Sequence, residues 1–240
     1  MLNTKANIIS QLQKAILLLQ GFKPSNADGN DAGLGIIKQA FPNSTFPLGA
    51  IHEFFSTGTE DSAASFGFIA GILSSLMKSG SPSVWVSPSK IIFPPALKVF
   101  GIDPQKILFI QSKEPKEILW TIEEALKSDG VASVVGEINE IRFIESRRLQ
   151  LAVEQSKVTG FLLRQNPKNL ATACVTRWRV KSIPSEKGSI PGIAFPKWNV
   201  ELLKVRNGKP GCWQMEWKKK EFHLIPNQSS VSIERERKVV

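Results

Sequence analysis

The sequence contains few of the residues that build disulfides and metal sites. It has two cysteines, two histidines and no tyrosine. Cys174 and Cys212 lie in strand-like surroundings, so we expect two buried free thiols in a reducing cytoplasm rather than a disulfide. His52 and His223 have no carboxylate or cysteine partner at ligand spacing, which argues against a metal site. We therefore expect no metal and no cofactor.

Long apolar runs are also absent. The hydrophobic content is 42%, but no run approaches the roughly 20 residues that span a membrane. The short run at residues 15–19 lies in an amphipathic helix expected at residues 4–20, and no signal-peptide cleavage site follows it. We expect a cytoplasmic globular protein without membrane contact, and 240 residues are enough for a sizeable core.

Acidic residues are scarce in one part of the chain. The net charge is +10, and residues 1–163 carry 15 basic and 15 acidic side chains. Residues 164–220 carry 13 basic and 3 acidic side chains, which accounts for the whole excess. A basic segment beside a neutral region predicts a polyanion or an acidic protein surface as the partner.

The stretch at residues 49–73 has the order of a phosphate-binding loop: a short apolar strand, a polar loop and an apolar helix. The pattern of such loops is G-x-x-x-x-G-K-[ST]. Gly58 stands at its first position and Ser65 at its last. Ala63 replaces the second glycine, and Ala64 replaces the lysine that would meet the β- and γ-phosphates. The sequence therefore predicts a degenerate phosphate loop.

The surroundings of this loop also argue against nucleotide hydrolysis. Glu60 and Asp61 place two carboxylates where a polyphosphate would sit. The strand after the helix ends in residues 86–89, V-S-P-S, without the acid that would activate water. Glu137 follows a later strand and is either a metal partner or a solvated loop residue. The alternative for the loop itself is an ordinary strand–loop–helix turn with Asp61 or Ser62 as N-cap. We expect a protein that is not an enzyme.

From residue 48 the chain alternates short apolar strands with helices. Such alternation is typical of a parallel sheet covered on both faces, and the fold class is α/β. The expected strands are residues 50–55, 83–86, 107–110, 131–135 and 160–163, and the expected helices are residues 62–78, 94–101, 115–127 and 143–156.

After residue 165 the pattern changes to antiparallel strands. Residues 172–183 and 198–206 alternate, Asn207-Gly208 is a hairpin signal, and residues 212–217 and 221–225 complete the segment. We expect four parts: a helix and linker at 1–45, an α/β core at 46–166, a basic antiparallel β segment at 167–225, and a disordered tail at 226–240.

Charged and aromatic residues are interleaved in the basic segment. Strand alternation puts Arg177, Arg179 and Lys181 on one face, with Trp178 and Val180 on the other. The functional interpretation is a cationic face that meets phosphates or an acidic partner. The alternative is a solvated outer face above a tryptophan-containing core. The candidate contact residues are Arg177, Arg179, Lys181, Lys204, Arg206, Lys209, Lys218, Lys219 and Lys220.

Several stretches together resemble the ImuA proteins, which are RecA-like accessory factors of bacterial mutagenic DNA repair. The stretch F-P-L-G-A-I-H-E-F at 46–54 resembles their entry into the RecA-like core, and residues 83–110 follow the RecA-type order. T-R-W-R-V at 176–180 and V-R-N-G-K-P-G-C-W-Q-M-E-W at 205–217 look like their C-terminal hairpin. The resemblance covers residues 46–220, and the acidic pair Glu60-Asp61 has no counterpart in it.

The resemblance implies a RecA-like fold and a non-catalytic role. Family members act beside a Y-family-like partner protein and an error-prone replicative-type polymerase in translesion synthesis after DNA damage. The basic segment would then contact that partner or DNA, and self-association is also open. Three alternatives remain: an SOS cell-division inhibitor that binds the tubulin-like division protein, a DNA-binding RecA-like ATPase with a borrowed lysine, and a plain DNA-binding module.

Overall fold

The computed structural model describes residues 5, 7–9, 11–12, 15–16, 32–89, 93–184 and 195–226 of the chain. The described residues of the N-terminal stretch are helical. Four of its apolar side chains are about half exposed (Ile8, Ile9, Leu12 and Ile16). This part of the helix therefore does not pack on the core. Apart from residue 226, the tail expected at 226–240 lies outside the described residues.

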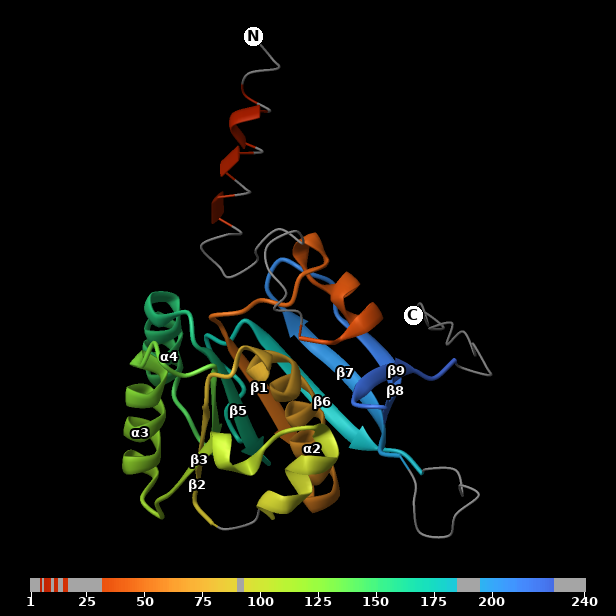
Figure 1. Ribbon diagram of the computed structural model, residues 1–240. Coiled ribbons are helices and arrows are strands. Elements are labelled where there is room, and N and C mark those ends of the chain that lie inside the picture. Colours follow the sequence, from red (N-terminus) through yellow and green to blue (C-terminus); the bar gives the residue numbers. More distant parts are fainter. Residues whose placement is uncertain are drawn as a thin grey trace, which may run out of the picture.

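The body is built on one nine-stranded sheet in the order β3-β2-β4-β5-β1-β6-β7-β8-β9 (Figure 1). The first five strands are parallel to one another. Their bounds are β1 Ile51–Ser56, β2 Ser83–Ser87, β3 Ile107–Gln111, β4 Ser133–Glu137 and β5 Thr159–Gln165. The expected alternation of strands and helices is confirmed, and most boundaries fall within two residues of those expected.

The last four strands extend the same sheet beyond β1. They are β6 Thr176–Ser182, β7 Lys197–Val205, β8 Gly211–Lys218 and β9 Glu221–Leu224. β6 is parallel to β1, and antiparallel pairing begins only between β6 and β7. We expected residues 172–183 and 198–206 to form a purely antiparallel unit, and this is wrong for the first strand. β6 pairs in parallel with β1 on one side and antiparallel with β7 on the other. The basic segment is thus continuous with the core.

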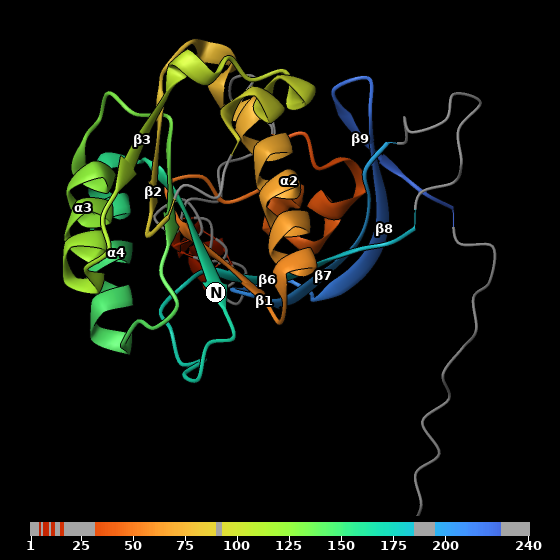
Figure 2. The ribbon, with the colours of Figure 1, turned by 90° about the horizontal axis from the view of Figure 1, so that it is seen from below.

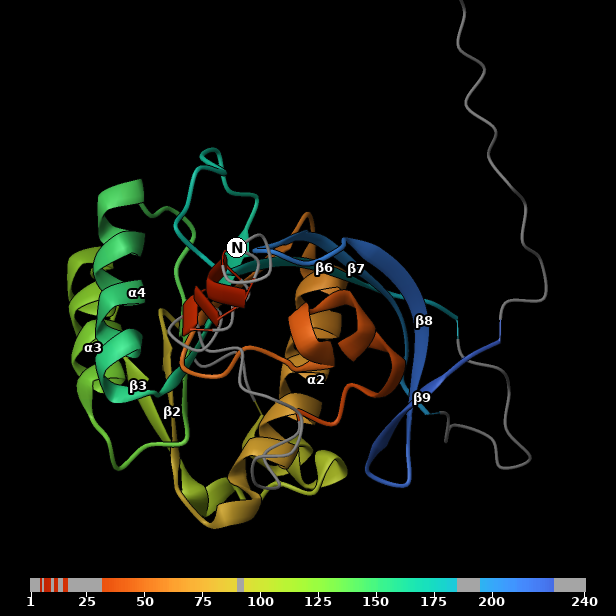
Figure 3. The ribbon, with the colours of Figure 1, turned by 90° about the horizontal axis from the view of Figure 1, so that it is seen from above.

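Helices cover the parallel part of the sheet on both faces. Helix α2 (Thr59–Leu76) lies on one face, and α3 (Pro115–Lys127) and α4 (Phe143–Ser156) lie on the other (Figure 2). Shorter 3-10 turns at Gly35–Ala40, Pro42–Ser44 and Pro94–Phe100 flank α2. Over β6–β8, α2 and the first of these turns cover one face, and no described helix covers the other (Figure 3).

Two apolar clusters lie on the two faces of the sheet. The cluster under α2 is rich in aromatic side chains, including Phe54, Phe68, Trp178 and Trp217. The cluster under α3 and α4 is mainly aliphatic. Helix α2 packs on both the parallel and the antiparallel strands, which explains why it is apolar on nearly all sides.

Gly71 lets the antiparallel strands come close to α2. A Cβ atom at this position would lie 2.4 Å from Cζ of Phe222 and 2.9 Å from Cζ3 of Trp217. Those two rings are themselves in edge contact, with centroids 4.8 Å apart. The glycine thus fixes how closely β8 and β9 pack on the helix.

Both cysteines are free thiols, as expected. Cys174 is buried, and desolvation raises its pKa to about 12. The expectation that Cys212 is also buried is wrong, because its side chain lies on the helix-free face and is exposed. In the described parts of the chain, no helix has both the length and the apolar character to cross a membrane. Within those same ranges, no three His, Cys, Asp or Glu side chains are grouped to hold a metal.

Candidate functional site

The connection between β1 and α2 is much shorter than a phosphate loop. β1 ends at Ser56 and α2 begins at Thr59, with Gly58 as N-cap. The expected helix start at Ser62, with Asp61 or Ser62 as N-cap, is therefore wrong by three residues. The phosphate loop predicted from the Gly58 to Ser65 spacing is not formed.

The remaining positions of the pattern lie inside the helix. Ala63, Ala64 and Ser65 all belong to α2, and the Oγ atom of Ser65 is buried without a hydrogen-bond partner. Alanine has the highest helix propensity, and acidic residues are stabilised in the first turn of a helix. Two alanines and the acidic pair Glu60-Asp61 thus extend the helix through the positions where a loop would bend.

The polar groups of the short turn bind one another. The Oγ atoms of Ser56 and Ser62 are 2.7 Å apart, and the Ser62 hydroxyl donates to the carbonyl of Gly58 at 3.0 Å. The Thr57 hydroxyl donates to the carboxylate of Asp61 at 3.0 Å. The polar side chains of the turn are thus paired within the turn itself.

No basic residue is available near this turn along the chain. Residues 56–77 contain no lysine or arginine, so the lysine of the pattern is missing whichever residue is taken as its start. Glu60 and Asp61 both lie in the first turn of α2. Their charges already occupy the favourable field at the helix N-terminus, where a phosphate would otherwise bind.

Glu137, at the end of β4, has a third role that the sequence did not predict. It is half-buried, and the indole N–H of Trp85 donates to its Oε1 atom at 2.9 Å. Desolvation raises the pKa of this carboxyl to about 7, although the Trp85 hydrogen bond lowers it. The interpretation as a solvated loop residue is therefore wrong. No ion pair within the described residues involves Glu137.

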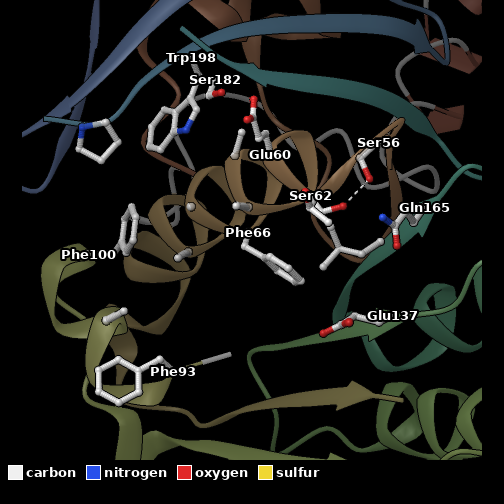
Figure 4. Close-up of a pocket in the computed structure, with 18 of the residues that line it drawn as sticks. Ser56, Glu60, Ser62, Phe66, Phe93, Phe100, Glu137, Gln165, Ser182 and Trp198 are labelled. Atoms are coloured by element: carbon white, nitrogen blue, oxygen red, sulfur yellow. Dashed lines mark hydrogen bonds between the residues drawn. The ribbon is translucent and has the colours of Figure 1, made fainter. Parts of the chain in front are cut away.

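A groove of about 710 Å³ opens beside these residues at the carboxyl ends of the parallel strands. Its lining includes the first half of α2, the ends of β1, β2, β4 and β5, the Pro94–Phe100 turn and the start of β7. Figure 4 shows Phe66 and Glu137 on one side of α2, and Glu60, Ser182 and Trp198 on the other. Ser65 is not among the lining residues. Ligands of open α/β sheets bind at this edge.

A buried ionic cluster joins the core to the basic segment. The carboxylate of Glu53, which is fully buried in β1, forms ion pairs with Arg164 of β5 and Arg177 of β6. The Arg177 Nε atom lies 2.7 Å from it, and the Thr172 hydroxyl donates to it at 3.0 Å. Sequence reasoning missed this cluster. A glutamate in I-H-E-F-F and an arginine in F-L-L-R were its signals, because charges inside buried strands need partners.

The predicted cationic face is partly used by the protein itself. Arg177, Arg179 and Lys181 do share the helix-free face of β6, opposite the buried Trp178 and Val180. Arg177 is held by Glu53, and Arg179 pairs with Glu201 at 3.3 Å and lies over the ring of Phe55. The side chains of Lys204 and Arg206 donate to the backbone carbonyls of Thr172 and Ala173.

The lysines of the two hairpin turns lie at opposite ends of β8. Lys209 is in the β7–β8 turn, and Lys218, Lys219 and Lys220 surround the β8–β9 turn. An eight-residue strand spans about 25 Å. The candidate basic residues therefore form separate groups and not one patch. The Lys218–Lys220 group is beside the Pro94–Phe100 turn, because the indole N–H of Trp217 donates to the carbonyl of Val99 at 3.3 Å.

Comparisons with known proteins give relatives by sequence and by structure. No protein-family model matches the chain. Protein ImuA of Caulobacter vibrioides strain NA1000 / CB15N is 32% identical over 196 residues, which covers 75% of this chain and 80% of the relative. Protein ImuA of strain ATCC 19089 / CIP 103742 / CB 15 of the same species matches equally well.

Two solved structures establish the fold class. The RadB recombinase matches with a TM-score of 0.58 at 12% identity, covering 80% of this chain and 98% of the other. A KaiC-like protein from Pyrococcus horikoshii OT3 matches with a TM-score of 0.55 at 15% identity, covering 82% and 98%. The expected RecA-like fold, with its C-terminal antiparallel strands, is confirmed.

Proposed function

Because this chain belongs to the ImuA family, we propose that it is a non-catalytic RecA-like accessory protein of damage-induced mutagenesis. In this proposal it holds together the components of translesion synthesis. Its partners are a Y-family-like protein and an error-prone replicative-type polymerase, as the family resemblance implies. DNA is a further partner of its basic residues.

The β1–α2 turn is the observation that supports the non-catalytic part. The turn is closed by its own hydroxyl and carboxylate groups, and α2 occupies the positions of the phosphate loop. The nucleotide site of P-loop enzymes needs free backbone N–H groups and a lysine on the β- and γ-phosphates. This turn carries Glu60 and Asp61 and no basic residue. A bound triphosphate would therefore meet repulsion where it needs a counter-charge.

The exposed lysines support a binding role for the antiparallel strands. Lys181, Lys209 and Lys218–Lys220 are exposed or partly exposed, and no ion pair within the described residues engages them. Arg177, in contrast, is held by Glu53. We assign contact with phosphates or with an acidic partner surface to the exposed lysines, and a structural role to Arg177.

Two measurements test this function together. The purified chain, mixed with ATP, Mg²⁺ and single-stranded DNA, should release phosphate no faster than the protein-free blank. Deleting the gene should lower damage-induced mutation frequency, and the wild-type chain should restore it. DNA-dependent turnover that disappears in Ser62→Ala would contradict the non-catalytic assignment. Capture of the tubulin-like division protein in place of the polymerase components would contradict the role in mutagenesis.

A further inference from the structure

The groove at the carboxyl ends of the parallel strands is lined by side chains that suit a binding site. Its floor on α2 is made of small side chains at Ala63, Gly67 and Ala70. Gly67 lets the rings of Trp198 and Phe100 come close to α2, since a Cβ atom there would lie 3.0 Å from Trp198 and 3.3 Å from Phe100. At about 710 Å³, the groove is large enough for several side chains of a ligand.

Aromatic side chains stand on both sides of this floor. The rings of Phe66 and Trp85 are 5.6 Å apart, and those of Phe100 and Trp198 are stacked with centroids 6.5 Å apart. Phe93, which also lines the groove, is 70% exposed. An exposed aromatic side chain beside an apolar groove is typical of an interaction site. The ligand must therefore carry large apolar groups.

The groove lining carries two acidic side chains, Glu60 and Glu137, and two basic ones, Arg164 and Lys197. The Glu137 carboxyl receives one hydrogen bond, from Trp85, and no basic residue of the described ranges forms an ion pair with it. Arg164 also lines the groove, but its guanidinium is used by Glu53 and by the carbonyls of Asn139 and Asn169. A half-buried carboxylate has room for further donors and is stabilised by a cation with charge-assisted hydrogen bonds.

The second acid and the remaining cation lie elsewhere along the groove. Glu60 is exposed on the other side of α2, again without an ion pair in the described ranges (Figure 4). Lys197 lines the groove at the start of β7 and already has an interaction of its own. Glu137 is therefore the group that needs a cation, and Glu60 adds a weaker attraction from its exposed position.

We propose that this groove is the docking site for an extended peptide segment of a partner protein, in which a lysine or arginine stands beside a large apolar side chain. The basic side chain pairs with Glu137, and the apolar side chain packs against Phe66 and Phe93, which lie on the same side of α2 (Figure 4). The proposal rests on the accessory function above and names the chemistry of the partner. Glu60 and Glu137 disfavour a nucleic-acid strand in the same groove, because its phosphates would meet two carboxylates.

Selection of random 12-residue peptides displayed on phage, on the immobilised full chain, tests this directly. The expected consensus contains Lys or Arg next to Phe, Trp, Leu or Met. A fluorescent peptide of the consensus sequence should then lose about 10- to 100-fold in affinity on Glu137→Gln, since a hydrogen bond to a charged group is lost. Ala63→Trp should also weaken binding, because Ala63 is exposed on α2 and the indole would fill the floor.

The matched control is Asp129→Asn. Asp129 is an exposed acid in the turn that leads into β4, at the opposite edge of the sheet from Glu137. This variant should bind the consensus peptide with unchanged affinity. Circular dichroism of all three variants verifies that they are folded, so that a loss of binding is assigned to the groove.

Three results would overturn the proposal. They are a consensus without a basic residue, no enriched peptide at all, or a consensus peptide that binds Glu137→Gln as well as wild type. Binding of oligo(dT) that tightens on Glu137→Gln and is blocked by Ala63→Trp would instead assign the groove to single-stranded DNA. Phosphate release and mutation frequency do not depend on these assays, so the proposed function is tested separately.

Discussion

The strands on the two sides of β6 carry their charges in different ways. Toward β5, the basic side chains near β1 are buried and paired: Arg164 is fully buried against Glu53. Toward β9, Lys209 and Lys218–Lys220 are exposed at the hairpin turns, and no ion pair within the described residues holds them. Arg177 of β6 belongs to the first group, although the sequence places it among the basic residues of the second. A basic stretch of sequence is thus not the same as a basic surface.

Breaking the buried ionic cluster should have the largest effect on stability. Arg164→Met leaves the Glu53 carboxylate buried with Arg177 and Thr172 as its remaining partners. Removing one partner of a buried ion pair costs about 3–5 kcal/mol. Urea unfolding of this variant and of the control Lys181→Met, an exposed change on β6, measures the difference. A loss no larger than that of Lys181→Met would show that the cluster is not structural.

Filling the space at Gly71 should have the next largest effect. Gly71→Ala places a methyl group 2.4 Å from the Phe222 ring, so β9 must move away from α2. Overpacking of this kind costs about 1–3 kcal/mol. Gly130→Ala is the control, because no atom lies within 4 Å of its Cβ position. Thermal or urea unfolding compares the two, and equal stabilities would contradict the close packing of the antiparallel strands on α2.

Lowering the pH should reduce the free energy of unfolding through His52, and Glu137 should offset this reduction. His52 is buried, with Nε2 2.9 Å from the carbonyl of Pro47 and Nδ1 2.8 Å from the Thr176 hydroxyl. Since a carbonyl only accepts, Nε2 carries the proton and donates to Pro47. Burial lowers the pKa of His52 to about 3, so the folded state stays neutral while the unfolded state takes up a proton below pH 6.5.

His52 and Glu137 change the free energy of unfolding in opposite directions as the pH falls. Between pH 7 and 5.5 His52 should lower the free energy of unfolding by about 1 kcal/mol, while Glu137, with its pKa raised to about 7, should increase it by a similar amount. Urea unfolding of the wild type should therefore change little over this range. The free energy of unfolding of Glu137→Gln should fall by about 1 kcal/mol over the same range. A pH-independent Glu137→Gln variant would contradict the buried neutral histidine.

The exposed lysines should matter least for stability and most for binding. Replacing Lys218, Lys219 and Lys220 by glutamine should change stability by less than about 0.5 kcal/mol, as surface substitutions usually do. If they contact phosphates, the slope of log affinity for single-stranded DNA against log salt concentration should fall by about 2. Arg177→Gln should show the reverse, with lower stability and an unchanged slope. Equal salt slopes for the wild type and the lysine variant would remove these residues from a DNA interface.

The sequence predicted the fold well because each element carried a local signal. Asn207-Gly208 marked the β7–β8 turn, and the short apolar strands between helices indicated the parallel sheet. The direction of β6 had no such signal, because its pairing with β1 joins residues more than a hundred positions apart. The site was predicted less well. Helix propensity at Ala63 and Ala64 outweighed the glycine spacing and removed the expected loop.

The contacts that form the groove are also long-range. Trp85 and Glu137 are joined by a hydrogen bond across 52 positions, and Phe100 stacks on Trp198 from a different part of the chain. The hydrophobic periodicity of a segment predicts its secondary structure, but it does not predict contacts between residues that are far apart in the sequence. A charged residue inside an apolar strand, such as Glu53, does indicate a buried ion pair. In this protein that ion pair stabilises the sheet and does not form a binding surface.

Titration of ATP and Mg²⁺ into the purified chain by calorimetry tests the central claim most directly. The closed β1–α2 turn, with Glu60 and Asp61 at the helix start and no lysine, predicts no saturable heat up to millimolar nucleotide. The same flat trace is expected for Lys197→Ala, the variant of the lysine that lines the groove. One ATP bound per chain with micromolar affinity, and lost in Lys197→Ala, would contradict the account, because the site would then have borrowed its cation from β7.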